Sequence, residues 1–202
     1  MKIAVIGSTG ATGNLVLQEA IHRGHDVTAF ARHADALTGI VDPSNIVEGD
    51  GCDRAALNRV VAGQDAVIDA VGSSGTPDAI SAVARNLTEA MHYAGVSRLV
   101  ATSAYGMIAK KPYIVASLVR RIFRTTFADQ QAADLIIEAS PLDWTILRAT
   151  RLANGTAKRQ GRFSTDLLRR GPYSITRTAY AAALIDLAEN HAHTRQIVNI
   201  TG

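Results

Sequence analysis

The chain has 202 residues, of which 47% are hydrophobic and 19% charged, so it can bury one substantial core and is too short for two full domains. We therefore expect one domain over residues 1–202. The single cysteine excludes an intramolecular disulfide, and the first apolar run is too short for a secretory segment or a membrane span. These features predict a cytoplasmic protein with no membrane partner.

The formal net charge of +3 is modest, but cations gather in the second half of the chain. The electrostatic field of these cations favours an anionic ligand or partner. The alternative for most of them is that they simply form a solvated basic surface. No helix-turn-helix, zinc-finger or RNP-like pattern accompanies them, so we expect no nucleic-acid partner. The basic residues are Lys110, Lys111, Arg120, Arg121, Arg124, Arg148, Arg151, Arg159, Arg162, Arg169 and Arg170.

Apolar runs alternate with helical repeats along the chain. This pattern predicts an α/β fold, a doubly wound Rossmann fold whose mainly parallel sheet is covered by helices on both faces. In chain order, we expect strands over residues 2–7, 27–31, 46–48, 66–71, 99–103, 144–147 and 197–200.

Capping residues, glycine and proline mark the ends of the helices between these strands. Asp53 is expected to cap the helix that ends at Gly63. Pro77 and Asp78 are expected to open a longer helix that ends at Gly95.

The second half of the chain is less regular. Residues 113–139 are predicted to be helical with a break near Thr125 and Thr126, and Thr178 is expected to cap the last helix. Residues 151–172 are polar, basic and glycine-containing, which predicts a small excursion from the sheet on the substrate side.

A glycine-rich segment lies between the first strand and the first helix. In its G-x-x-G-x-x-G spacing, the first glycine permits a tight turn, the second leaves room for a pyrophosphate, and the third lets helix and strand pack closely. The N–H groups and dipole at the helix start would meet the phosphates. We therefore predict a dinucleotide site formed by Gly7, Ser8, Thr9, Gly10, Ala11, Thr12 and Gly13.

The end of the second strand distinguishes the two nicotinamide dinucleotides. NAD-preferring sites place a carboxylate there to accept from the ribose 2′-hydroxyl, whereas this strand ends Ala31-Arg32-His33. A guanidinium matches a 2′-phosphate, so Arg32 predicts NADP(H); an exposed arginine at a strand end is the alternative. Further cofactor contacts are expected after the third and fourth strands, from Asp50, Gly51, Ala70, Val71 and Gly72.

Several segments together carry a family resemblance: the glycine motif, 27–32, Gly49-Asp50, 62–67, 102–104, 142–148 and 175–177. With these segments the chain resembles, over essentially its whole length, the atypical short-chain dehydrogenase/reductases. Within them it resembles the NmrA-like group, which includes biliverdin reductase B (flavin reductase) and bacterial NADH-flavin reductase-like proteins. The resemblance implies a monomer or weak dimer that uses NADPH to reduce a flat conjugated acceptor such as a flavin, quinone or tetrapyrrole.

The resemblance also implies roles for individual residues. Ser103 stands at the position of the active-site serine, where it would hydrogen-bond the nicotinamide amide or the substrate; a satisfied strand-end hydroxyl is the alternative. Arg148 would face the cofactor cleft. The substrate side would be formed by Tyr105, Met107, Thr150 and Arg151, with ordinary loop packing as the alternative for the first two.

Two departures from the family pattern matter. The Tyr-x-x-x-Lys pair of classical short-chain dehydrogenases is absent, because Tyr105 is followed four residues later by Ala109 and Tyr113 by Ser117. Where the biliverdin reductase B branch has Pro-Pro-His, this chain has residues 148–151, Arg-Ala-Thr-Arg. A histidine role there is not carried over, which puts activity on tetrapyrroles in doubt.

The lost histidine and the basic tract over 110–124 leave a second hypothesis open, a non-catalytic NADP(H)-sensing regulator of NmrA type. Cys52 is expected to be a small buried residue near the adenine. Apart from His191 and His193 at an expected helix end, the six histidines show no ligand spacing with cysteines or carboxylates, so no metal is expected.

Overall fold

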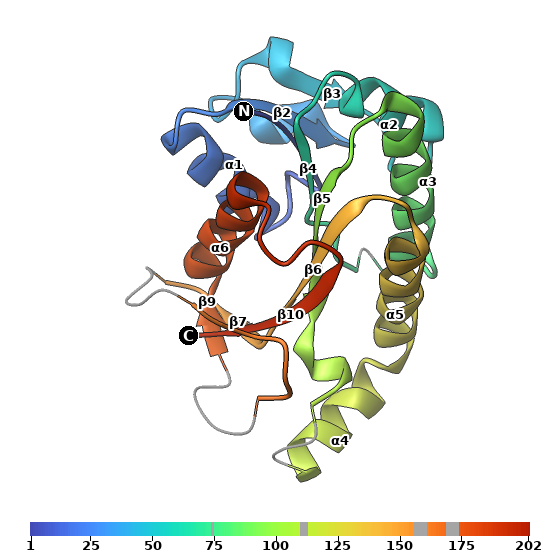
Figure 1. Cartoon of the computed structure of the whole chain (residues 1–202), viewed down its shortest axis with the longest axis vertical. Coiled ribbons are helices and arrows are strands. Elements are labelled where there is room, and N and C mark those ends of the chain that lie inside the picture. The colour runs from blue at the N-terminus through green and yellow to red at the C-terminus, as the bar shows by residue number, and fades with distance from the viewer. Residues whose placement is uncertain (74, 110–112, 156–160, 169–173) are drawn as a thin grey trace.

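The computed structural model describes residues 1–73, 75–109, 113–155, 161–168 and 174–202 (Figure 1). Five of the basic residues singled out above lie outside the described residues: Lys110, Lys111, Arg159, Arg169 and Arg170.

In the described part of the chain, the centre of the molecule is an eight-stranded sheet in the order β3-β2-β1-β4-β5-β6-β10-β8. Neighbouring strands are parallel except β8, which runs antiparallel to β10. The order 3-2-1-4-5-6 of the first six strands is that of the doubly wound dinucleotide-binding sheet, so the predicted fold class is confirmed. The strands are β1 (Lys2–Ile6), β2 (Asp26–Ala31), β3 (Ile46–Glu48), β4 (Ala66–Asp69), β5 (Arg98–Ala104), β6 (Asp143–Ala149), β8 (Arg162–Ser164) and β10 (Gln196–Thr201).

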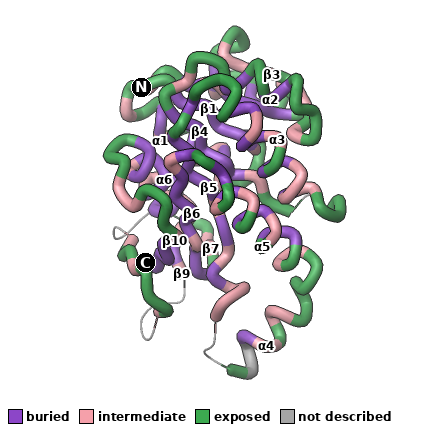
Figure 2. Tube along the Cα trace, turned by 45° about the vertical axis from the view of Figure 1, so that its right-hand side comes forward, coloured by how far each residue is buried: buried purple, intermediate pink, exposed green. Residues whose placement is uncertain are grey.

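Helices cover both faces of this sheet (Figure 1). On one face α1 (Gly13–His22) packs beside α6 (Arg177–Asn190), and on the other lie α2 (Arg54–Val61), α3 (Ala79–Ala94) and α5 (Arg124–Ala139). The central strands are buried from both sides, as Figure 2 shows. Burial on both faces explains why they are continuous apolar runs rather than alternating ones.

The remaining elements are short. The 3-10 helices are η1 (Ala34–Leu37), η2 (Pro43–Asn45) and η3 (Tyr105–Met107), and α4 (Tyr113–Ile122) extends away from the sheet (Figure 1). The break in the long helical stretch falls at Phe123, the N-cap of α5, slightly before the predicted position.

The predicted helix ends are partly confirmed. The Asp53 side chain accepts from the Ala55 N–H at 2.9 Å and caps α2, and Gly95 ends α3 with a φ of 70°. The cap of α6 is Thr176, whose hydroxyl accepts from the Ala179 N–H at 3.2 Å, so the prediction of Thr178 was wrong. Both threonines offer a capping hydroxyl, and only the backbone decides which one is used.

The start of α3 depends on a contact that the local sequence does not contain. Asp78 at its N-cap makes no side-chain capping bond. Instead Asp129, on α5, accepts from the N–H groups of Ile80 and Ser81 at 3.0 and 2.9 Å. A carboxylate distant in sequence thus satisfies the free donors at this helix end.

The stretch after β6 was expected to leave the sheet, and part of it does. Here β7 (Arg151–Ala153) pairs in parallel with β9 (Ser174–Thr176) as a separate two-stranded sheet. The expectation was wrong for β8, which pairs with β10 and extends the main sheet. Three residues are too few to show strand periodicity, so the sequence gives no local signal for this pairing.

Within the described ranges, no helix is both long enough and apolar enough to cross a membrane.

Candidate functional site

The glycine loop between β1 and α1 is shaped by two close backbone approaches. Gly7 has a φ of +77°, and a Cβ there would lie 2.9 Å from the carbonyl oxygen of Ala70 at the end of β4. A Cβ on Gly13 would lie 2.2 Å from the carbonyl oxygen of Gly7. The tight turn and the close helix packing predicted from the motif are therefore present.

The start of α1 is left open to a ligand. Its N-cap, Thr12, makes no side-chain capping bond, and the first turn contains no acidic residue. The first N–H groups of a helix have no acceptor within the helix, and they carry the positive end of its dipole. They are therefore suited to bind an anion such as a diphosphate.

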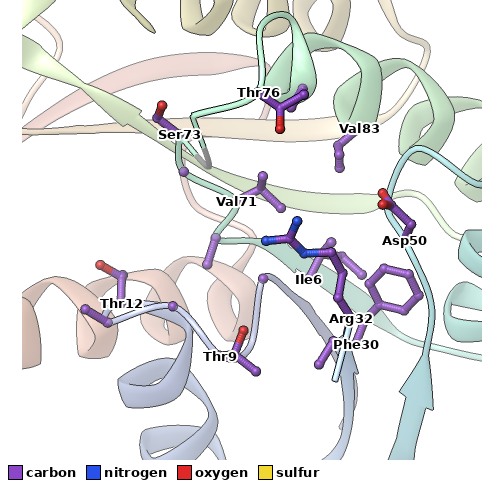
Figure 3. Close-up of a pocket in the computed structure, with 18 of the residues that line it drawn as sticks. Ile6, Thr9, Thr12, Phe30, Arg32, Asp50, Val71, Ser73, Thr76 and Val83 are labelled. Carbon is purple, nitrogen blue, oxygen red and sulfur yellow. The ribbon is translucent and has the colours of Figure 1, made fainter. Parts of the chain in front are cut away.

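A cleft of about 570 Å³ opens over this helix start at the carboxyl ends of β1, β2 and β4 (Figure 3). Its position is the switch point of the sheet, where β1 lies between β2 and β4 and open α/β folds bind their ligands. The predicted cofactor residues that line it are Gly7, Thr9, Gly10, Ala11, Thr12, Arg32, Asp50, Gly51, Ala70, Val71 and Gly72.

Arg32 projects its guanidinium into this cleft from the end of β2 (Figure 3). The side chain is exposed and makes no hydrogen bond or ion pair within the described part of the chain. Asp50 lies on another wall, and its carboxylate accepts from the Cys52 N–H at 2.8 Å. An arginine without a partner beside a deep cleft can bind an anionic group of a ligand.

Two residues of the glycine motif do not line the cleft. Ser8 is fully buried; its hydroxyl donates to the Val5 carbonyl at 2.6 Å and accepts from the Phe30 N–H at 3.0 Å. Ser8 therefore ties β1 to β2 and positions the loop. Gly13 lies beneath the loop in the contact with Gly7 described above.

Ser103, predicted to be catalytic, lies at the end of β5 in a buried polar cluster. Its hydroxyl donates to Asp134 at 2.9 Å, and Arg148 donates to the same carboxylate oxygen at 2.9 Å. Gln130 donates to the other oxygen at 3.2 Å. Ser103 and Arg148 face each other across the β5–β6 pair, and Asp134 comes from α5.

The cluster is held in low-dielectric surroundings. Asp134 is 1% exposed. Burial raises the pKa of this carboxyl, while the donors from Arg148, Ser103 and Gln130 oppose that shift. Neither Ser103 nor Arg148 lines the cleft over α1, and the Nε atom of Arg148 is buried without a partner among the described residues. Arg148 was predicted to contact the cofactor; its bonded nitrogen points inward, toward Asp134.

The predicted substrate residues lie elsewhere than the cleft over α1. Tyr105 is buried, and its hydroxyl accepts from the Leu168 N–H at 3.0 Å, which attaches the stretch after β8 to the end of β5. Thr150 is buried, its hydroxyl 3.4 Å from that of Thr201. Met107 is half-buried and Arg151 exposed. Their role in substrate binding remains a prediction.

The expectation for Cys52 was wrong, because this residue is exposed and lines the cleft rather than filling the core. Asn86, on α3, stabilises the loop that carries Cys52 by donating to the carbonyl groups of Gly51 and Cys52. Among the described residues, no group of three or more His, Cys, Asp or Glu side chains is arranged to hold a metal ion.

With this geometry established, comparison with known families identifies the chain. A family profile described as NAD(P)H-binding matches residues 7–191, from the first glycine of the loop to the end of α6. The chain belongs to this NAD(P)H-binding family.

Known proteins share its length and fold. The uncharacterized protein YwnB of Bacillus subtilis (strain 168) is 26% identical over 97% of this chain and 96% of its own. ChuY, an anaerobillin reductase from Escherichia coli O157:H7, is 21% identical, covers 99% of this chain and 96% of its own, and superimposes with a TM-score of 0.85. A short-chain dehydrogenase/reductase from Veillonella parvula in complex with NADP is 18% identical, with a TM-score of 0.78 over 100% of this chain and 94% of its own.

The cleft fits the ligand class of the family. The uncapped start of α1 and the guanidinium of Arg32, which has no partner among the described residues, line the same cleft and offer donors for phosphate groups. Its size lies within the range of clefts that bind small molecules and cofactors.

Sequence reasoning missed two residues with unusual surroundings, Asp134 and Arg177. Asp134 shares the buried face of α5 with Ala133 and Ile137. An acid at a core position of an amphipathic helix is a detectable signal, because buried carboxylates need partners. Arg177, at the start of α6, lines the cleft.

Asp69, at the carboxyl end of β4, should make the stability of the protein depend on pH. Burial raises its pKa from 3.8 to about 6, and its carboxylate accepts from the Val71 N–H at 3.0 Å. The folded chain therefore keeps a proton that the unfolded chain releases. This contribution to stability is complete below the unfolded pKa and is lost as the pH rises through the folded pKa.

Between about pH 4 and pH 7, we expect the contribution of Asp69 to the free energy of unfolding to fall by up to about 3 kcal/mol. Asp69→Asn keeps an oxygen for Val71 and removes the charge, so its advantage over the unsubstituted chain should grow with pH. Urea unfolding of both proteins across this range measures the difference. A difference that does not change with pH would contradict the assignment.

Proposed function

We propose that the protein is an NADPH-dependent reductase that passes hydride to a flavin or a similar flat conjugated acceptor, in the manner of biliverdin reductase B among the atypical short-chain dehydrogenase/reductases. The observation that carries the proposal is the guanidinium of Arg32, which lies in the cleft over α1 and has no partner in the described part of the chain. Membership of the NAD(P)H-binding family supports it, as does the fold shared with an anaerobillin reductase. We expect the protein to act in a reducing compartment such as the cytoplasm.

The choice of NADPH over NADH follows from the end of β2. No carboxylate stands at residues 29–33 to accept from a ribose 2′-hydroxyl, whereas Arg32 offers a fork of charged donors. A related fold has been crystallised with NADP, which agrees with this choice.

The chemistry requires little from the side chains. The reduced nicotinamide supplies the hydride when the cofactor is bound. The start of α1 and Arg32 would hold the phosphate groups, and the ends of β4 and β5 would fix the rings and exclude water. Because the cofactor would supply the hydride and the protein would only position the reactants, the reaction does not require a Tyr-x-x-x-Lys pair.

The orientation of Ser103 determines what its hydroxyl can do. Its proton is directed to Asp134, so its remaining lone pairs are available to accept a hydrogen bond. We therefore propose that Ser103 accepts from the N–H of the nicotinamide amide or of the substrate. The proton that completes reduction of the acceptor would then come from solvent.

Turnover with a panel of acceptors tests the proposal. The purified protein is expected to consume NADPH steadily with FMN or riboflavin, followed at the absorbance of the reduced cofactor. Absence of turnover with flavins, quinones and bilins, combined with equal affinity for NADP+ and NADPH, would refute the reductase. That result would favour the NADP(H)-sensing regulator instead.

Arg32→Ala should weaken NADPH far more than NADH. Loss of a charge-assisted contact with the 2′-phosphate is expected to cost about 1.5–3 kcal/mol, or roughly 10- to 150-fold in Kd. Calorimetric titration of both dinucleotides into both proteins measures the ratio. Arg121→Ala, an exposed arginine on α4, is the matched control. An unchanged NADPH/NADH ratio in Arg32→Ala would remove Arg32 from the site.

A further inference from the structure

Arg177 is a second cation in the cleft and has no assigned role. It lines the cleft together with Leu152. One guanidinium nitrogen donates to the side-chain oxygen of Asn154, a neutral partner. Within the described ranges it forms no ion pair, so its charge is uncompensated by the protein.

The packing of α6 against α1 places Arg177 at the level of the glycine loop. Arg23, directly after α1, pairs with Asp186 at 2.7 Å and Glu189 at 2.9 Å on α6. Gly13 precedes Arg23 by ten residues, and Arg177 precedes Asp186 by nine. The two helices pack side by side, and the residue after α1 pairs with residues near the end of α6, so the helices run in the same direction. Each residue advances a helix by about 1.5 Å, so their first residues lie at about the same height.

The local setting of Arg177 also points to an anionic ligand. It occupies the first position of α6, where the positive end of the helix dipole disfavours a cation. Among the described residues that line the cleft, Asp50 is the charged residue besides Arg32 and Arg177. NADP(H) carries a 2′-phosphate and a diphosphate. The proposed function assigns the 2′-phosphate to Arg32, which leaves the diphosphate for a second cation.

We propose that Arg177 binds the diphosphate of the dinucleotide from the side opposite the amides of α1, so that the diphosphate is held between two helix starts. The inference rests on the proposed function, since it assumes a dinucleotide in this cleft. Arg32 then selects between cofactors, whereas Arg177 contributes to binding of both. The ion pairs of Arg23 keep α6 in register with α1 and thereby position Arg177.

Calorimetry with three probes separates these roles: NADP+, NAD+ and adenosine 2′-monophosphate, which has the 2′-phosphate but no phosphate on the 5′ side. Arg177→Gln is expected to raise the Kd of NADP+ and NAD+ by the same factor, about tenfold, and to leave that of adenosine 2′-monophosphate within about twofold. Arg32→Ala should weaken NADP+ and adenosine 2′-monophosphate and leave NAD+ nearly unchanged. Arg177→Lys should recover part of the loss, and Arg121→Gln should bind like the unsubstituted chain.

Several outcomes would overturn the inference. Unchanged dinucleotide affinity in a folded Arg177→Gln, checked by thermal unfolding, would exclude the contact while leaving the proposed function intact. An equal loss for adenosine 2′-monophosphate would show that the variant perturbs the whole cleft. A change confined to the KM of FMN would assign Arg177 to the acceptor's phosphate. If the unsubstituted protein binds neither dinucleotide, the proposed function fails first and the inference falls with it.

Discussion

Replacing Asp134 by leucine is expected to lower the free energy of unfolding by about 3–5 kcal/mol, the cost of breaking a buried ion pair from one side. The substitution removes the carboxylate that accepts from Ser103, Gln130 and Arg148. Arg148, whose side chain is 15% exposed, would keep its charge without a partner. Equilibrium unfolding in urea measures the loss.

The double variant Asp134→Leu with Arg148→Met is the informative control. Replacing both members of a buried pair by apolar residues of similar size is often neutral, so the double variant should regain most of the stability. If the double variant instead loses the sum of the two single losses in free energy of unfolding, the ion pair does not account for the stability of the cluster. Ser103→Ala, which removes one donor from the carboxylate, should cost about 1.5–3 kcal/mol, less than Asp134→Leu.

Gly13→Ala is expected to damage folding and dinucleotide binding together. The new Cβ would lie 2.2 Å from the carbonyl oxygen of Gly7 and 2.9 Å from its carbonyl carbon, so backbone must move. We expect a loss of about 3 kcal/mol in the free energy of unfolding, the upper end of typical overpacking costs. Because α1 would shift away from the loop, its N–H groups would no longer converge on a diphosphate, and NADP+ affinity should fall by at least about 100-fold.

Gly72→Ala provides the stability control for this experiment. A Cβ there meets nothing within 4 Å, and the residue does not need a positive φ. Its unfolding free energy should therefore remain within about 0.5 kcal/mol of the unsubstituted chain. Near-normal stability and NADP+ affinity in Gly13→Ala would show that the loop can relax around the new methyl group. The close packing would then not be what holds the binding site.

The half of the candidate site around the glycine loop could be anticipated because its determinants are local. The turn at Gly7, the start of α1 and the position of Arg32 at the end of β2 all follow from short segments in which backbone geometry dictates residue type. Strand order could also be anticipated, since alternating strands and helices with right-handed crossovers leave few topologies. The helix caps at Asp53 and Gly95 belong to the same class of local signal.

The other half of the site depends on contacts between segments far apart in the chain. Nothing local to Ser103 indicates that its proton is directed to Asp134, or that Arg148 turns inward to the same carboxylate. Likewise, Arg177 reaches the cleft because ion pairs and apolar packing hold α6 beside α1. A motif fixes residue types, but the direction of a side chain is decided by what packs around it.

The sequence by itself therefore determined the central strands, the glycine turn after β1 and the cation at the end of β2, because each is encoded within a few neighbouring residues. Tertiary structure alone decided which polar groups are buried together, which helix start is capped by Asp129, and that β8 returns to the edge of the sheet. The physical reason is that buried charges and free backbone donors must find partners wherever the fold supplies them, at any distance along the chain.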